Sequence, residues 1–272
     1  MYKSLLFGLA ATMLLLMCGC QLFESDIEIL VPTELNEIPV EETVDQIVTT
    51  ETAAPTPLGL ECGTYEGSFY DEATCASMEY YVYVPEQAVE SMPLVIYLHG
   101  IGSVGPLELN RDNPMIEKAR EVYGDDFPFL ILAPSTSIAT WASHTVPERL
   151  KALTDYITEQ YCVDPDKIII TGHSLGSAGV YRMLELYGDY FSAAVPVSEP
   201  DTSEVDVSLC TNVRIWGFAG ALEPECSDQM QKLTEEINAL GGNARFTEIE
   251  NCGHGRSPYG AFLWDVFEWM IK

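Results

Sequence analysis

The stretch that most constrains the fold runs from Ile168 to Gly176 and reads Ile-Ile-Ile-Thr-Gly-His-Ser-Leu-Gly. Its β-branched run predicts a buried strand, and the small residues and helical spacing that follow predict a helix. A strand joined to a helix by Gly-x-Ser-x-Gly places Ser174 at the apex of a sharp turn, with its hydroxyl above the sheet edge. The flanking glycines let strand and helix approach without Cβ clashes. The stretch therefore predicts a nucleophilic serine; a glycine-rich turn that only packs is the alternative.

Strands and helices alternate from residue 64 onward. Strands are predicted at Thr64–Phe69, Glu79–Val84, Leu94–Leu98, Phe129–Ala133, Lys167–Thr171, Ala193–Val197, Val213–Phe218 and Arg245–Glu250. Helical periods fit residues 112–122, 147–161, 175–187, 227–240 and 260–271. The later strands are near-continuous apolar runs, as in parallel strands covered on both faces, and the first two fit an antiparallel edge pair. The chain is thus predicted to be α/β, a doubly wound, mostly parallel eight-stranded sheet with helices on both faces.

A serine hydroxyl becomes a good nucleophile when a neighbouring base takes its proton. Four histidines are available: His99, His144, His173 and His254. His254 directly follows the last predicted strand, at the carboxyl edge of the sheet where Ser174 also emerges. We therefore expect His254 to be the base, with His144, in a loop before a helix, as the alternative.

A carboxylate is expected to orient this histidine and to stabilise its protonated form. By chain order it follows the sixth or the seventh strand. Glu223 comes soon after the seventh strand, in Gly220-Ala-Leu-Glu-Pro-Glu225, and is the predicted acid. The alternatives are Glu225, Asp228, Asp201 and Glu199.

Two backbone N–H groups are predicted to bind the negatively charged oxygen of an acyl-transfer intermediate. One belongs to Leu175, at the start of the helix after Ser174. The other belongs to Ile101, in the His99-Gly-Ile-Gly102 loop after the third strand. The cysteines and histidines lack paired metal-ligand spacing, so neither a metal nor a cofactor is expected.

The first 57 residues differ in composition from the rest of the chain. Residues 1–20 combine Lys3 with an apolar run, as in a secretion signal, and end in Cys18-Gly19-Cys20. This ending resembles the lipobox of bacterial lipoproteins, which implies a lipid on Cys20; plain secretion or an uncleaved anchor are the alternatives. Residues 21–57 carry nine acids and neither Lys nor Arg, which predicts a disordered acidic tether. Residues 58–272 are long enough for one catalytic α/β domain.

Six cysteines follow the predicted signal, at positions 62, 75, 162, 210, 226 and 252. An even count in an exported chain indicates disulfides, with free buried thiols as the alternative. Cys162 and Cys210 each precede a predicted strand, whereas Cys226 and Cys252 each follow one. Because the two ends of a strand lie beyond disulfide reach, the expected pairs are Cys162–Cys210 and Cys226–Cys252, which leaves Cys62–Cys75 across the first hairpin.

Residues 75–272 as a whole resemble bacterial α/β-hydrolase esterases of the prolyl oligopeptidase, dienelactone hydrolase and phospholipase/carboxylesterase group, especially feruloyl esterases and polyhydroxybutyrate depolymerases. The matching segments are Pro93–Gly100, Val163–Gly176, Tyr190–Val197 and Gly241–Thr247. The resemblance implies the α/β-hydrolase fold, with Ser174 as nucleophile, His254 as base and Glu223 where members usually carry Asp. It also implies that Trp141, in the loop after the fourth strand, faces the substrate; packing is the alternative.

The expected function is that of a cell-surface serine esterase acting on extracellular carboxylic esters, including acyl groups on polysaccharides or oligosaccharides. A serine peptidase of the oligopeptidase type and a non-catalytic binding lipoprotein are the alternatives. The net charge of −29 argues against nucleic acid as a partner and against charge-driven membrane binding. The expected location is the outer face of a bacterial cytoplasmic membrane, reached through the lipid anchor alone, or the medium if the chain is secreted.

Overall fold

The computed structural model describes residues 59–138, 140–143, 145–199 and 201–272. The predicted signal, lipidation site and tether lie outside these residues, as does His144. Within the described ranges, no helix has the length and apolar character needed to cross a membrane.

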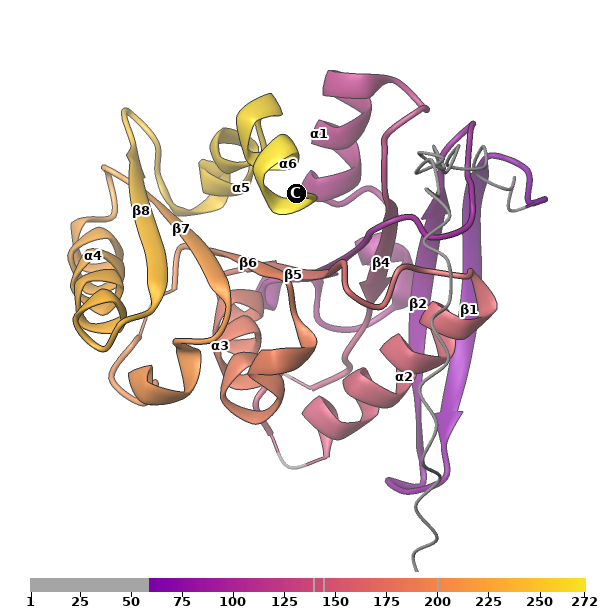
Figure 1. The fold of residues 1–272 in the computed structure, drawn as a ribbon, viewed down its shortest axis with the longest axis horizontal. Helices are drawn as coiled ribbons and strands as arrows, with labels where there is room; N and C mark the ends of the chain where they lie inside the picture. The colour runs from indigo at the N-terminus through magenta and orange to yellow at the C-terminus, as the bar shows by residue number, and fades with distance from the viewer. Residues whose placement is uncertain (1–58, 139, 144, 200) are drawn as a thin grey trace, which may run out of the picture. The chain divides into compact units, whose positions relative to one another are not determined.

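One sheet organises the described residues, with eight strands in the order β1-β2-β4-β3-β5-β6-β7-β8 (Figure 1). The strands are β1 (Gly63–Asp71), β2 (Ala76–Val84), β3 (Leu94–Leu98), β4 (Leu130–Pro134), β5 (Ile168–His173), β6 (Ala193–Val197), β7 (Arg214–Gly220) and β8 (Asn243–Ile249). Strand β2 runs antiparallel to both β1 and β4, and all other neighbours are parallel. The predicted mostly parallel sheet with an antiparallel edge pair is confirmed.

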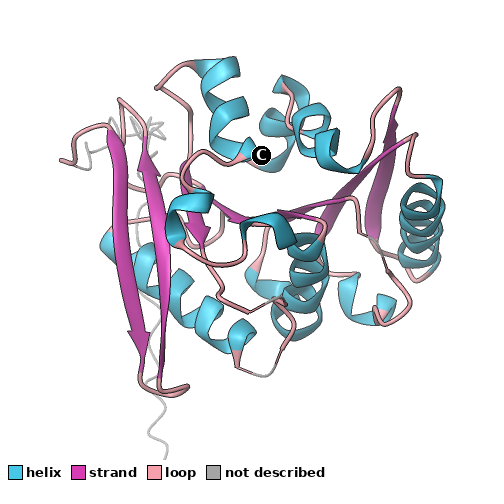
Figure 2. Cartoon of the chain, turned by 180° about the vertical axis from the view of Figure 1, so that it is seen from behind, coloured by secondary structure: helices cyan, strands magenta, loops and turns pink. Residues whose placement is uncertain are grey.

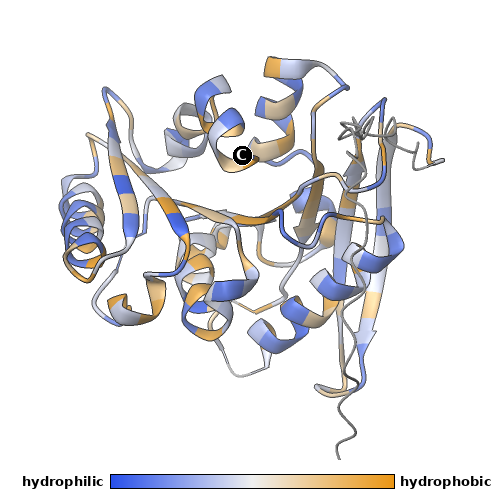
Figure 3. Cartoon of the chain, viewed as in Figure 1, coloured by the Kyte–Doolittle hydropathy of each residue, from blue (hydrophilic) through white to orange (hydrophobic). Residues whose placement is uncertain are grey.

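Burial along the strands follows their place in the sheet. The inner strands β3, β4 and β6 are buried at every residue, because their uninterrupted apolar runs face helices on both sides. The edge strands β1 and β8 alternate between exposed and partly buried residues. Figure 3 shows the same contrast, with hydrophobic colour concentrated on the central strands.

Helices cover both faces of the sheet (Figures 1 and 2). Apolar residues of α2 (Val146–Gln160), α3 (Leu175–Tyr187) and α4 (Pro224–Ala239) belong to one hydrophobic cluster. Residues of α1 (Pro114–Tyr123), α5 (Ser257–Ala261) and α6 (Trp264–Met270) belong to a second cluster. Each cluster also contains side chains from alternate positions of the inner strands, so the sheet separates two cores, as a doubly wound architecture requires.

Two helix predictions need correction. Helix α4 begins at Pro224, whereas the prediction began at residue 227, because proline at the first helical position is preorganised for a helix. The predicted helix over 260–271 is two short helices, α5 and α6. Phe262, which lies between them, leaves helical geometry with φ −82° and ψ 82° and is fully buried in the core.

The structure contains none of the three predicted disulfides, because all six cysteines in the described residues are free. Strand β1 pairs with β2 from Gly63↔Val84 to Asp71↔Ala76. Cys62 and Cys75 therefore lie at opposite ends of the hairpin, about 30 Å apart at 3.3 Å per residue, and the predicted local link is wrong.

The other two predicted pairs also fail. The carbonyl of Cys162 accepts a hydrogen bond from the N–H of Ser91, near the start of β3, whereas Cys210 lies just before β7. Since β5 and β6 separate these strands, the two cysteines are about 14 Å apart, beyond disulfide reach. Cys226 lies inside the first turn of α4, not at the end of a strand, and it and Cys252 are buried free thiols.

Candidate active site

Ser174 occupies the sharp turn between β5 and α3 that the sequence predicts. Its backbone has φ 55° and ψ −119°, a conformation that non-glycine residues rarely adopt. A Cβ on Gly172 would collide with the carbonyl of Gly176, and one on Gly176 would collide with the carbonyl of Leu98 in β3. The two glycines therefore let β5, α3 and β3 meet closely enough to hold Ser174 in this strained turn.

The two residues whose N–H groups are predicted to bind the oxyanion are each the first residue of a helical segment. Leu175 is the first residue of α3, and Ile101 is the first residue of a 3₁₀ turn that ends at Ser103. The first N–H groups of a helix have no partner within it. Ile101 lines the same cavity as Ser174, and Leu175 is the residue next to the serine. Neither N–H group donates a described hydrogen bond, and both stay predicted oxyanion donors.

His254 and Glu223 form a hydrogen-bonded pair, with Nδ1 of His254 2.6 Å from Oε2 of Glu223. The second carboxylate oxygen accepts hydrogen bonds from the N–H of Gly220, at 2.7 Å, and from the hydroxyl of Ser198. Burial raises the pKa of Glu223, but hydrogen bonds from Ser198, Gly220 and His254 outweigh this and leave its pKa lowered. The carboxylate therefore stays ionised and fixes the orientation of the imidazole.

The other predicted acids do not pair with His254 in the described structure. Glu225, Asp228 and Asp201 are exposed. Glu199 is 1% exposed, and burial raises its pKa to about 8. Among the described carboxylates, Glu223 is the one that the fold places against His254.

Two serines that the sequence analysis did not single out connect the acid to the histidine loop. Ser198 follows β6 with φ 51°, donates to Glu223, and its Oγ lies 2.6 Å from the Oγ of Ser257. The hydroxyl of Ser257 donates to the backbone carbonyl of His254 at 2.8 Å. A polar residue directly after β6, at the carboxyl edge of the sheet, was the available signal for Ser198.

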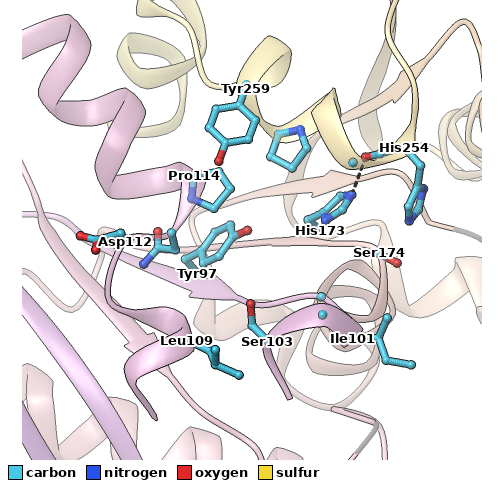
Figure 4. A pocket seen from close by; sticks show the side chains of 15 residues that line it. Tyr97, Ile101, Ser103, Leu109, Asp112, Pro114, His173, Ser174, His254 and Tyr259 are labelled. Carbon is cyan, nitrogen blue, oxygen red and sulfur yellow. Dashed lines mark hydrogen bonds between the residues drawn. The ribbon is translucent and has the colours of Figure 1, made fainter. Parts of the chain in front are cut away.

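His173 supports the same loop from the other side. Its Nε2 lies 2.8 Å from the carbonyl oxygen of His254, and the two rings are 4.8 Å apart between centroids (Figure 4). Burial, and to a smaller extent the neighbouring His254, lowers the pKa of His173 to about 4. His173 is therefore neutral, and its N–H donates to the backbone of the histidine loop.

Trp141 packs in the core, so the expectation that it faces the substrate is wrong. It is 1% exposed and does not line the cavity that holds Ser174. Its Nε1–H donates to the carbonyl of His99 at 2.9 Å, and its ring meets the His99 ring edge-on. The indole thereby braces the strand end that leads into the loop of Ile101.

Replacing Trp141 by phenylalanine should lower the free energy of unfolding by about 1–3 kcal/mol, because the buried carbonyl of His99 loses its donor. Urea unfolding followed by circular dichroism measures this loss. Trp264, which is 57% exposed, provides the control: Trp264→Phe should change stability by less than about 0.5 kcal/mol. A raised KM in Trp141→Phe at unchanged stability would instead indicate contact with substrate.

Ser174 and His254 open into one cavity of about 380 Å³ (Figure 4). In the described structure no hydrogen bond joins the serine hydroxyl to the imidazole; such bonds often tighten when substrate binds. Residues Tyr97, Leu109, Pro114, Pro258 and Tyr259 supply apolar and aromatic lining. The cavity suits an organic group attached to an ester bond at Ser174.

The structure also brings together three potential metal ligands, a cluster that the sequence analysis did not predict. One ligand atom each from Glu223, Cys226 and His254 lies within 4.8 Å of the others. Burial, followed by the neighbouring carboxylates, raises the pKa of Cys226 to about 12. The thiol is therefore protonated at neutral pH, and the other two ligand atoms are hydrogen-bonded to each other.

No protein-family model matches the sequence, and no curated protein matches it. Solved structures do match. A thermostable esterase is 24% identical, with TM-score 0.62, over 76% of this chain and 62% of that one. A ferulic acid esterase is 13% identical, with TM-score 0.60, over 78% and 99% of the two chains. A poly(3-hydroxybutyrate) depolymerase from Bordetella parapertussis is 14% identical, with TM-score 0.56, over 71% and 86%.

The chain thus spans less than two thirds of the thermostable esterase, but nearly all of the ferulic acid esterase. At these identities the likeness concerns architecture. It shows that the chain has the α/β-hydrolase fold, as the sequence predicted.

Proposed function

We propose that the chain is a serine esterase that hydrolyses carboxylic esters through an acyl-enzyme on Ser174. The observation that carries this proposal is the 2.6 Å pairing of His254 Nδ1 with Glu223, beside the cavity that Ser174 also lines. With the Nδ1 proton held by the acid, Nε2 is left free to act as a base. The α/β-hydrolase fold and the esterases among its structural neighbours support the assignment.

In the first half-reaction, Nε2 of His254 takes the hydroxyl proton while Oγ of Ser174 attacks the ester carbonyl carbon. The negative charge that develops on the carbonyl oxygen is stabilised by the N–H groups of Ile101 and Leu175. Glu223 stabilises the imidazolium. When the intermediate collapses, the ester C–O bond breaks and His254 gives its proton to the leaving alcohol.

In the second half-reaction, water takes the place of the alcohol. His254 removes a proton from this water as its oxygen attacks the acyl carbon. The bond between the acyl carbon and Oγ of Ser174 then breaks, and the serine recovers its proton from the imidazolium. The acid product leaves, and the free enzyme is restored.

Release of 4-nitrophenol from 4-nitrophenyl acetate and butyrate tests the proposal directly. We expect turnover of these esters, much slower release of 4-nitroaniline from matched anilides, and labelling of Ser174 by a fluorophosphonate probe. Faster cleavage of the anilides would favour the peptidase alternative. Absence of both turnover and labelling in folded protein would favour the non-catalytic binding protein.

We also propose that the substrates are extracellular esters, including acyl groups on polysaccharides or oligosaccharides. Supporting this are the secretion-like residues 1–20, the acidic stretch that follows them, and the ferulic acid esterase and polyester depolymerase among the structural neighbours. A fully extended tether of residues 21–57 would reach roughly 110 Å at ~3.1 Å per residue, far enough to sample polymers beyond a membrane.

Replacing Cys20 by alanine should release the protein from the membrane fraction into the medium, or leave it uncleaved as a precursor. The reason is that a diacylated cysteine supplies the two lipid chains that stable anchoring needs. Cell fractionation and the mass of the mature N-terminus measure the outcome, with Cys18→Ala as the matched control. Membrane retention of a cleaved Cys20→Ala protein would rule out lipid anchoring at this residue.

A further inference from the structure

A buried phenol faces the proposed ester-binding cavity without a hydrogen-bond partner in the described structure. Tyr97, near the end of β3, is 3% exposed and lines the cavity. Burial raises the pKa of its hydroxyl well above the usual range, followed by a smaller effect of Tyr259, and no hydrogen bond offsets either. In Figure 4 the hydroxyl of Tyr97 points into the cavity.

The buried tyrosines differ in their hydroxyl partners: no hydrogen bond is described for the hydroxyl of Tyr181, whereas that of Tyr83 is paired. Tyr83 is 1% exposed, and its hydroxyl donates to the backbone carbonyl of Arg111 at 2.5 Å. The hydroxyl oxygen of Tyr97 is not itself enclosed by protein, so it can bind water or a ligand in the cavity. Since the hydroxyl of Tyr97 points into the cavity, a bound molecule is the natural partner.

Tyr259 approaches the same cavity from α5, on the opposite side from Tyr97 (Figure 4). Burial, and then the negative charge of Glu117, raises the pKa of its hydroxyl. A phenol can both donate and accept a hydrogen bond, so Tyr97 can act as the donor and Tyr259 as the acceptor. A hydroxyl group fits between them, because it can accept from Tyr97 and donate to Tyr259.

A carboxylate fits this place less well. Asp112 also lines the cavity, Glu117 lies behind Tyr259, and the chain as a whole has a net charge of −29. An anionic group would meet repulsion from these acids, whereas a neutral hydroxyl would not.

We propose that Tyr97 and Tyr259 form a hydroxyl-binding subsite, which holds a neutral hydroxyl group on the cavity-bound part of the substrate. The inference rests on the proposed esterase function and deepens it, since it names the chemistry that the cavity selects. Tyr97 and Tyr259 position and select the substrate without taking part in bond breaking.

Ester pairs that differ by one hydroxyl group test the subsite. The short pair is methyl 3-hydroxybutyrate and methyl butyrate; the long pair is methyl 4-hydroxycinnamate and methyl cinnamate. In at least one pair, wild-type kcat/KM should favour the hydroxylated ester by about tenfold or more. Tyr97→Phe should abolish this preference by lowering kcat/KM for the hydroxylated ester.

Tyr181→Phe is the matched control, because Tyr181 is 2% exposed and lies in the core on the other face of the sheet. It should keep the hydroxyl preference. Thermal unfolding of Tyr97→Phe without ligand should occur close to the wild-type temperature, since the variant loses no described hydrogen bond within the protein. Absence of a preference in both pairs, or a preference that Tyr97→Phe retains, would overturn the subsite.

Titration of the same esters onto Ser174→Ala by calorimetry separates this inference from the proposed function. If wild-type protein hydrolyses no ester, the esterase proposal fails. The subsite still stands if Ser174→Ala binds the hydroxylated ester of a pair more tightly than the unhydroxylated one, and if adding Tyr97→Phe removes that difference. If esters are hydrolysed but neither kinetics nor binding depends on Tyr97, the subsite fails and the esterase proposal stands.

Discussion

Replacing Ser174 by alanine should lower ester turnover by at least ~10³-fold, because the variant lacks the oxygen that forms the acyl-enzyme. Alanine keeps the Cβ and the strained backbone of the turn, where φ is 55°, so the variant should fold like wild type. Turnover of 4-nitrophenyl butyrate and thermal unfolding, measured on the same preparation, check both halves of this expectation.

Ser192→Ala is the matched control for the nucleophile. Ser192 lies at the start of β6, at the amino end of the strands and away from the cavity, and its hydroxyl donates to the carbonyl of Ile168. Its loss should leave turnover within about twofold, since distant polar substitutions have small effects. Undiminished hydrolysis by purified, correctly folded Ser174→Ala protein would end the serine-esterase proposal.

Replacing Glu223 by glutamine should lower kcat by about 10²–10⁴-fold. A neutral amide still reaches Nδ1 of His254 but cannot stabilise the imidazolium. The amide can also present its NH₂ group to Nδ1, which would place the imidazole proton on Nε2 and block its action as a base. Glu225→Gln, two residues further along and exposed, should change kcat by less than about twofold.

The effect of Glu223 on stability should depend on pH with a defined sign. Its pKa is lowered in the folded protein, so the ionised carboxylate stabilises the fold above its unfolded pKa. That contribution is lost as the pH falls through the folded pKa. In urea unfolding, the free energy of unfolding should therefore differ between wild type and Glu223→Gln at pH 7, and this difference should shrink in acid.

The assignment of the acid has its own test. Strong loss of activity in Asp201→Asn, with Glu223→Gln still active, would place the acid after β6.

Local patterns explain why much of the fold was predictable. Apolar runs mark each inner strand, and glycines mark the turn around Ser174, because these features depend on residues close together in the chain. The rule that parallel strands end at one edge then predicts that His254 lies on the same side of the sheet as Ser174. Helix boundaries were less certain, as Pro224 shows for α4.

What the sequence determined by itself was therefore the α/β architecture, the strained serine turn and the edge of the sheet where the site lies. Tertiary structure decided which of several acids meets His254: Glu223 is 31 residues away in the chain, and Ser198, which supports it, is another 25 residues away. It also decided that Trp141 packs, that the cysteines stay apart and that Tyr97 faces the cavity unpaired. The physical reason is the same in each case. Strand order and helix packing bring distant residues together, and short-range propensity carries no information about those contacts.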